Sequence, residues 1–167
     1  MATLDRMDHL ASFAILLHDS MRSGRVWGRD VAGFPAITYN LARADVDRMH
    51  RAMIRAGGRC LAAGAKELYP VMISSPIIEG RREFDAFRRK KPAAGDYVWL
   101  SYHPLGTCKM GADSTTSVVG IDHQTHDVGG LFIVDGSTVP GPLGVNPQLT
   151  IMAMATRAAE KIDERLG

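Results

Sequence analysis

The residue with the clearest chemical capacity is a histidine in the last third of the chain. His103 follows the apolar segment 97–102 (Tyr-Val-Trp-Leu-Ser-Tyr), which we expect to be a strand, and precedes the glycine-containing stretch 104–111. An imidazole group titrates near pH 6.5, so it can accept a proton from a substrate hydroxyl close to neutral pH. A histidine at a strand end can also serve structure alone, by hydrogen bonding to nearby backbone.

A second candidate stands at the expected start of the terminal helix. Asn146 and Pro147 are residue types favoured at an N-cap and at the first helical position, so capping alone explains the pair. A capping Asn146 would still keep its NH₂ group free. Because an amide offers a donor and an acceptor and does not titrate, it could also steady a negatively charged oxygen. The helix is apolar on most sides as far as Ala155, which predicts that its N-terminal half is buried.

Three motifs, taken in chain order, together resemble one protein family. They are residues 102–111 (Tyr-His-Pro-Leu-Gly-Thr-Cys-Lys-Met-Gly), residues 131–137 (Leu-Phe-Ile-Val-Asp-Gly-Ser) and residues 144–155 (Gly-Val-Asn-Pro-Gln-Leu-Thr-Ile-Met-Ala-Met-Ala). This combination, at this spacing, resembles the C-terminal segment of the glucose–methanol–choline (GMC) family of flavin-dependent alcohol oxidoreductases. The resemblance is strongest from about residue 97 to residue 166 and looser before it.

The resemblance implies catalytic roles for His103 and Asn146. In the family, the histidine faces the flavin and accepts the proton of the substrate hydroxyl while hydride leaves the carbinol carbon for the flavin. A His or Asn beside it hydrogen-bonds the substrate oxygen. We therefore expect oxidation of the CH–OH group of a small-molecule alcohol, with His103 as general base and Asn146 as its partner.

The resemblance also implies a site for part of FAD. Asp135-Gly136 would contact the ribityl–pyrophosphate portion, largely through backbone N–H groups. The start of the terminal helix would lie against the flavin's pyrimidine edge, where the helix dipole would stabilise the negative charge of reduced flavin by about 0.3–2 kcal/mol. The residues expected to bind the cofactor are Asp135, Gly136, Asn146, Pro147, Gln148 and Thr150.

Complete members of the family begin with a strand, a Gly-x-Gly-x-x-Gly turn and a helix that hold the ADP part of FAD. The glycine pairs at 57–58 and 129–130 lack that spacing. We therefore expect FAD to be shared with an N-terminal FAD-binding portion or a partner chain, and the isolated chain to be incomplete and inactive. Without that portion, the terminal strand and helix would expose apolar surface.

The expected fold is α+β, in two parts. Residues 1–100 would form part of a substrate-binding domain, an antiparallel sheet with flanking helices. Residues 101–167 would carry the catalytic pair and would add the C-terminal strand and helix to a Rossmann-like FAD-binding domain whose N-terminal part is missing. Strands are expected at 11–18 paired with 25–28, at 34–39, at 97–102 and at 131–134, and helices at 45–63, 83–91 and from 147 onward.

The first long helix should begin with Asp45 as its N-cap and end before Gly64. Its Gly57-Gly58 pair weakens a helix by about 1 kcal/mol per glycine relative to alanine, which a close approach to the sheet would explain. Four arginines lie mainly away from its apolar face. We interpret them as a solvated face rather than a polyanion site, because no aromatic residues interleave with them. They are Arg48, Arg51, Arg55 and Arg59.

Two other classes of function stay open. One is a GMC-derived interaction module that has lost activity. The other is a metal-binding protein that uses His103, Cys108, His123 and His126, although His-x-x-His is a poor zinc spacing without further cysteine or carboxylate ligands. Cys108 itself is interpreted as a small buried apolar residue, which is the usual role of a free cysteine.

Composition limits the remaining possibilities. The 167 residues are 46% apolar and 23% charged, with a formal net charge of +2. This near balance is ordinary for a soluble globular protein and gives no support for nucleic acid or an anionic membrane as a partner. No apolar run approaches the roughly 20 residues that cross a bilayer. With two cysteines and no signal-peptide pattern, we expect a cytoplasmic location.

Overall fold

Helices and very short strands alternate along the chain. The α-helices are α1 (Arg43–Ala62), α2 (Gly80–Arg88) and α3 (Gln148–Leu166). β1 (Arg25–Arg29) pairs antiparallel with β2 (Pro35–Thr38), and β3 (Glu67–Leu68) pairs antiparallel with β4 (Ile78–Glu79). Short 3₁₀ helices cover Leu4–His9, Ala94–Asp96 and Gly136–Thr138. The computed structural model describes residues 4–20, 24–29 and 32–167, and in this part of the chain the fold is mixed α+β, as expected.

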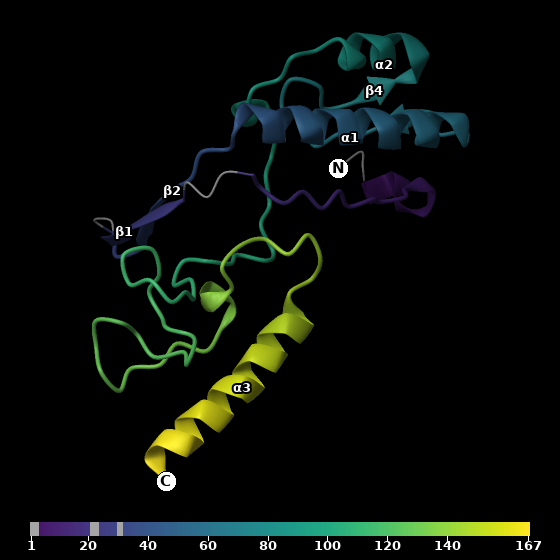
Figure 1. The fold of residues 1–167 in the computed structure, drawn as a ribbon. Coiled ribbons are helices and arrows are strands. Elements are labelled where there is room, and N and C mark those ends of the chain that lie inside the picture. The colour runs from purple at the N-terminus through teal and green to yellow at the C-terminus, as the bar shows by residue number, and fades with distance from the viewer. Residues whose placement is uncertain (1–3, 21–23, 30–31) are drawn as a thin grey trace.

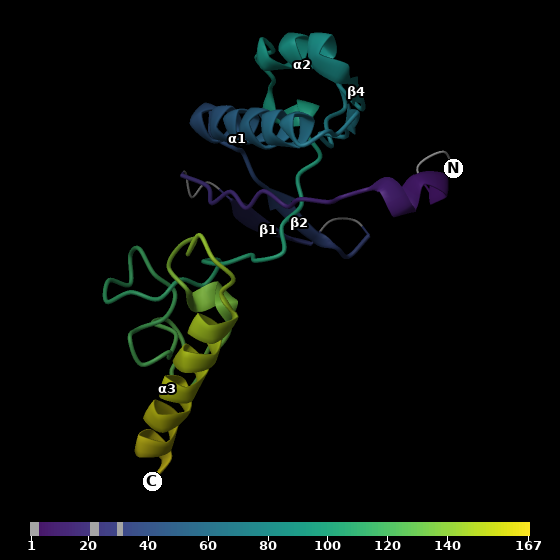
Figure 2. The ribbon, with the colours of Figure 1, turned by 90° about the vertical axis from the view of Figure 1, so that its right-hand side faces the viewer.

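These elements fall into two groups. The helices α1 and α2 lie together at one end of the molecule and α3 lies at the other, with the β1–β2 hairpin between them (Figure 1). The view from the side gives the same order (Figure 2). The catalytic candidates therefore belong to the α3 end, apart from the α1–α2 layer.

An aromatic core joins α1 to α2. The rings of Phe84 and Phe87, one turn apart on α2, are stacked with centroids 6.2 Å apart and are 7% and 2% exposed. Val46 on α1 and Tyr97 beyond α2 are packed into the same cluster. α2 begins earlier than the expected residue 83, because the Glu83 carboxylate accepts the N–H of Glu79 at 2.7 Å and so caps a start at Gly80.

The start of α1 also differs from expectation. The helix begins at Arg43, so Asp45 lies inside its first turn and does not cap it. Instead the fully buried Asp45 carboxylate accepts hydrogen bonds from the backbone N–H and the hydroxyl of Ser20 at 2.9 and 2.8 Å, and it pairs with Arg48. Arg48 in turn donates to the carbonyl of His18 at 2.9 Å, so it does not belong to a solvated face. We call this set of contacts among Asp45, Arg48 and residues 18–20 the Asp45 clamp. The clamp fixes residues 18–20 against α1.

Burial raises the pKa of Asp45, but the hydrogen bonds from Ser20 and Arg48 outweigh it and hold the pKa below its usual range. The carboxylate is therefore charged at neutral pH and keeps its acceptors available to the clamp.

Three expected strands do not form. Residues 10–19 are extended without a pairing partner, and β1 pairs with β2 instead of with them. The segments 97–102 and 131–134 contribute single bridges only, Tyr97 with Met72 and Phe132 with Gln124. An apolar run becomes a strand only where a second backbone offers donors and acceptors along its length, and the described residues place none beside 10–19. The other two segments meet a second backbone only briefly. The N–H of Val98 donates to the carbonyl of Val71, and Leu131 and His123 accept from Thr125 and Ile133, so neither contact extends into a full strand.

Gly57 and Gly58 have different environments in α1. A Cβ built on Gly57 would lie 2.9 Å from the ring of Phe84 and 3.0 Å from a methyl of Leu68. A Cβ on Gly58 would lie 3.8 Å from Phe84, which is ordinary contact. The expected close approach thus exists at Gly57, although α2 and β3 supply it rather than a broad sheet.

This difference predicts opposite effects of two neighbouring substitutions. Gly58→Ala should raise the free energy of unfolding by about 1 kcal/mol, since alanine is the better helix former and its methyl makes only ordinary contact with the Phe84 ring. Gly57→Ala should give no gain or a loss, because the buried Phe84 ring must shift. Urea unfolding of both variants measures the difference. Equal stabilisation by the two substitutions would mean that the α1–α2 contact is looser than described.

A second prediction concerns His50, which is 7% exposed in the α1–α2 core. Its Nδ1 and the Tyr97 hydroxyl are joined by a 2.8 Å hydrogen bond, and among described residues its Nε2 has no partner. Burial lowers the pKa of His50, while the nearby charges of Asp47, Arg43 and Lys90 act in both directions and leave it below its usual value. The folded protein therefore resists protonation of this ring.

The unfolded chain takes up that proton near pH 6.5, so stability should fall as the pH drops from about 7.5 to 5. His50→Phe should flatten this part of the curve of unfolding free energy against pH, whatever it does to stability at pH 7.5. His9→Gln, at an exposed histidine, is the control and should keep the slope. An unchanged slope in His50→Phe would assign the pH dependence to another group.

Candidate functional site

The segment that follows His103 runs beside the segment that follows Asp135. The backbone N–H of Cys108 donates to the carbonyl of Ser137 at 3.0 Å, and that of Met110 donates to the carbonyl of Thr138 at 2.8 Å. Two sequence motifs that lie about thirty residues apart are therefore joined by backbone hydrogen bonds.

Gly136 is the point at which a third motif meets these two. A Cβ built there would lie 3.2 Å from a methyl of Leu105 and 3.1 Å from the Cδ1 of Ile151 in the first turn of α3. Leu105 is two residues after His103, and Ile151 is five residues after Asn146. The three motifs singled out from the sequence thus converge around one glycine.

The Asp135-Gly136 turn has a defined hydrogen-bond pattern. The Asp135 carboxylate accepts the N–H of Ser137 at 2.7 Å and so caps the short 3₁₀ helix Gly136–Thr138. The side-chain and backbone hydrogen bonds of Ser137 hold the pKa of Asp135 below its usual range. Among the described residues, the N–H groups of Asp135 and Gly136 have no acceptor, so both remain available to a ligand.

Pro147, and not Asn146, is the N-cap of α3. Pro147 is buried, and its carbonyl accepts the N–H of Ile151 at 2.9 Å. Asn146 is exposed and its side chain makes no hydrogen bond within the described residues, so the capping interpretation of this residue is wrong. The N–H groups of Gln148, Leu149 and Thr150 precede the first helical hydrogen bond and lack helical acceptors.

His103 is half-buried. Its ring has no hydrogen-bond partner in the part of the chain that the structure describes, so the backbone bond that a purely structural histidine would make is not there. The contacts of its neighbours Pro104 and Leu105 with the Gly136 turn position the residue instead. A half-buried imidazole with both nitrogens available can exchange a proton with a ligand.

His18 is a neighbour of this region that sequence reasoning missed. Its Nδ1 lies 3.7 Å from the position that a Cβ on Gly144 would take, and Gly144 is two residues before Asn146. The clamp of Asp45 and Arg48 holds the backbone at residues 18–20 and thereby places this imidazole. No local signal in the sequence could have revealed the contact, because it joins positions more than a hundred residues apart.

The four residues of the metal hypothesis have other environments. His126 Nε2 lies 2.9 Å from the Ser117 hydroxyl and 3.2 Å from the Gly111 carbonyl. His123 is fully buried, with its Nδ1 3.3 Å from the Ile133 carbonyl. Within the described residues, no three His, Cys, Asp or Glu side chains gather where they could hold a metal ion.

Comparison with known proteins identifies the family of the chain. Residues 21–155 match a family model described as GMC oxidoreductase. An uncharacterized GMC-type oxidoreductase of Mycobacterium tuberculosis (strain ATCC 25618 / H37Rv) is 31% identical over 159 residues, which cover 95% of this chain and 24% of the relative. An oxygen-dependent choline dehydrogenase of Proteus mirabilis is 31% identical over 151 residues, covering 86% of this chain and 26% of the relative. A 2-methyl-1,2-propanediol dehydrogenase of Mycolicibacterium austroafricanum is 47% identical over 66 residues, covering 40% of this chain and 12% of the relative.

The chain belongs to the GMC oxidoreductase family. It corresponds to the C-terminal domain of that FAD-dependent family, and it spans about a quarter of the length of the Mycobacterium and Proteus relatives. The GMC match includes His103, Asp135, Gly136 and Asn146. The roles expected for these residues stay predictions. The convergence of the three motifs around Gly136 indicates that the residues could act in one site.

The α3 helix of this GMC domain has an exposed apolar start. Leu149 is 79% exposed and Met152 is 57% exposed, so the N-terminal half of α3 is not buried within this chain. The exposure agrees with the expectation that the terminal helix shows apolar surface where the N-terminal portion is not present. None of the helices in the described residues is both long and apolar enough to cross a membrane.

The N-cap geometry leads to a third prediction. Asn146→Ala should change the free energy of unfolding by less than about 0.5 kcal/mol, because its side chain caps nothing, whereas loss of a true Asn cap costs about 0.5–2 kcal/mol. Asp135→Ala is the matched comparison. It removes the carboxylate that accepts the Ser137 N–H and should cost about 1 kcal/mol. Thermal or urea unfolding of both variants measures the two changes in stability. A loss of about 1 kcal/mol or more in Asn146→Ala would mean that Asn146 does cap α3.

Proposed function

We propose that this chain is the C-terminal part of a FAD-dependent alcohol oxidoreductase, in which His103 is the general base and Asn146 holds the substrate oxygen. The observation that supports this most strongly is the contact of both Leu105 and Ile151 with the Gly136 position. It draws the histidine motif, the Asp135-Gly136 turn and the start of α3 into one region.

His103 suits the removal of the hydroxyl proton. Its ring nitrogens are free of protein partners within the described residues, and it is only half-buried. A neutral imidazole can therefore accept the proton of a bound alcohol at a ring nitrogen, which leaves the oxygen with the negative character that favours hydride departure from the carbinol carbon. The proton can return to solvent after the reaction.

Asn146 suits the stabilisation of that oxygen. Because Pro147 caps α3, the Asn146 amide is not engaged in the helix start and its NH₂ group can donate to the substrate oxygen. An amide does not titrate, so this donor would act equally over a wide pH range. The nearby imidazole of His18, beside Gly144, would border the same substrate position.

The residues expected to meet FAD have donors to offer it. Asp135 and Gly136 present N–H groups without acceptors, and the first-turn amides at Gln148 and Thr150 point out of the helix end. Together with the helix dipole they form a place for negative charge. When bound, FAD would supply the hydride acceptor. The backbone of this chain would hold the ribityl–pyrophosphate portion at Asp135-Gly136 and the pyrimidine edge near Asn146 and Pro147.

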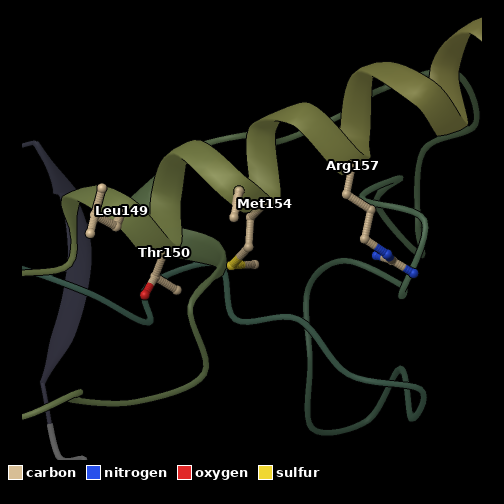
Figure 3. A pocket seen from close by; sticks show the side chains of 5 residues that line it. Leu149, Thr150, Met154 and Arg157 are labelled. Atoms are coloured by element: carbon tan, nitrogen blue, oxygen red, sulfur yellow. The ribbon is translucent and has the colours of Figure 1, made fainter.

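The exposed apolar residues at the start of α3, Leu149 and Met152, are suited to an N-terminal FAD-binding portion or subunit. Figure 3 shows Thr150, Met154 and Arg157 projecting together toward the loops of the same chain, and Arg157 donates to the carbonyl of Ile121. With Leu149 and Ala153 they line a cavity of about 460 Å³ that is largely apolar. We place the division between a substrate-binding part and this catalytic part at about residue 100, so that residues 101–167 complete the FAD site and residues 1–100 belong to the substrate side.

The fourth prediction tests His103 in the complete FAD-loaded enzyme. His103→Ala should slow flavin reduction by an alcohol substrate by roughly 10²–10⁴, which is the usual loss for a general acid–base group. The flavin spectrum should show that FAD stays bound, since His103 contacts substrate and does not anchor the cofactor. Anaerobic stopped-flow reduction is the measurement.

His9→Ala, at an exposed histidine of the N-terminal segment, is the control and should reduce flavin at the unaltered rate. If His103→Ala also reduced flavin normally, His103 would leave the mechanism. A complete protein that binds no FAD would instead favour the interaction-module function for this chain.

A further inference from the structure

A second cavity is lined by residues of α1 and α2. These two helices lie at the opposite end of the molecule from α3 (Figure 1). Its volume is about 380 Å³. Ten residues line it, and we call it the arginine groove. They are Ile54, Arg55, Gly58, Arg59, Leu61, Ala62, Arg81, Phe84, Asp85 and Arg88.

The charge of the arginine groove is poorly compensated. Four arginines and one aspartate give its lining a formal charge of +3, whereas the whole chain carries +2. Arg88 lies 3.4 Å from the Asp85 carboxylate. In the part of the chain that the structure describes, no carboxylate lies within 4.0 Å of the other three guanidinium groups, Arg55, Arg59 and Arg81. The arrangement gathers positive charge on two helices around one cavity.

The floor of the groove is apolar. Ile54 and Leu61 of α1 are half-buried beside it, and Phe84 of α2 is 7% exposed. Gly58 has no side chain to cover Phe84, whose ring would be 3.8 Å from a Cβ at that position. One large apolar side chain can therefore enter between guanidinium groups and rest on this floor.

We propose that the arginine groove binds an acidic segment of a partner protein, in which carboxylates stand on both sides of one apolar side chain. Guanidinium groups bind carboxylates through paired hydrogen bonds, and arginine is enriched in protein interfaces. Phe84 lies too deep to stack on a nucleobase, which separates this surface from single-strand nucleic-acid sites.

The groove stands apart from the proposed catalytic region. α1 and α2 lie at the far end from α3 in both ribbon views (Figures 1 and 2). An acidic partner bound there leaves the His103 side of the molecule open. The proposal therefore rests on the groove alone and stands or falls independently of the alcohol chemistry.

The test uses the full-length protein and two fluorescein-labelled peptides measured by anisotropy. One is Gly-Glu-Glu-Phe-Glu-Glu-Gly and the other has serine in place of phenylalanine. We expect saturable binding of the first in 50 mM salt, weaker binding in 300 mM salt because exposed charge pairs are screened, and at least about fivefold weaker binding of the serine peptide. Equal binding of the two peptides would overturn the proposal, because the apolar floor would then play no part.

Matched double variants locate the contact. Arg55→Gln with Arg81→Gln removes one groove arginine from each helix and should weaken binding about tenfold. Arg51→Gln with Arg82→Gln removes the same charge from exposed positions of the same helices outside the groove, and should change it less than about twofold.

Three further results would contradict the proposal. The first is equal weakening by the two double variants, which would mean diffuse electrostatic attraction. The second is absence of saturable binding to the unaltered protein, which would mean that the groove is covered or unused. The third is a twelve-residue deoxythymidine oligonucleotide that binds as tightly and responds to the same variants, which would assign the groove to a polyanion. Far-ultraviolet circular dichroism confirms that each variant is folded.

Discussion

The narrow space around Gly136 is the constraint on which the candidate site depends. A Cβ at this position would require the Leu105 or Ile151 methyl to shift by a few tenths of an ångström, so the packing favours a residue without a side chain. Gly106 adds a second tight point, since it has a φ of +81° and lies 3.3 Å, measured from a built Cβ, from the Val139 carbonyl. These contacts hold together segments that have no long ladder of hydrogen bonds, and they set where His103 and Asn146 can lie.

The motifs of the site could be recognised from the sequence, but the detailed role of each residue could not. Residue types and spacing around His103, Asp135-Gly136 and Asn146 are local, so they can be recognised without a structure. The cap of α3 could not be assigned from type alone, because Asn146 and Pro147 are both suitable near a helix start and the path of the preceding loop decides between them. The approach of His18 to Gly144 depends on the Asp45 clamp, which is entirely non-local.

For the fold as well, local features could be predicted from the sequence and non-local ones could not. Periodicity predicts α1, the helix carrying Phe84 and Phe87, and the strands β1 and β2, and Gly64 predicts the end of α1. Capping does not predict the start of α1, because Asp45 lies inside the first turn. Both segment 11–18 and segment 131–134 have the composition of strands, but the first has no strand partner among the described residues and the second pairs only through a single bridge to Gln124. Composition reports how apolar a segment is, whereas strand formation depends on a second segment that composition does not name.

On the proposed function, docking and catalysis are coupled by the same exposed residues. Leu100 and Tyr102, just before His103, are 70% and 77% exposed, and Val145 and Leu149, on either side of Asn146, are 64% and 79% exposed. Negative charge that develops on an alcohol oxygen is stabilised best where water is excluded and the hydrogen-bond donors are fixed in place. Burial of these apolar residues would contribute free energy to the association with a FAD-binding portion. It would also exclude water from the region around His103 and Asn146. The arginine groove lies at the other end of the molecule, so covering these apolar residues leaves it exposed. Its guanidinium groups must stay accessible for an acidic partner to bind them.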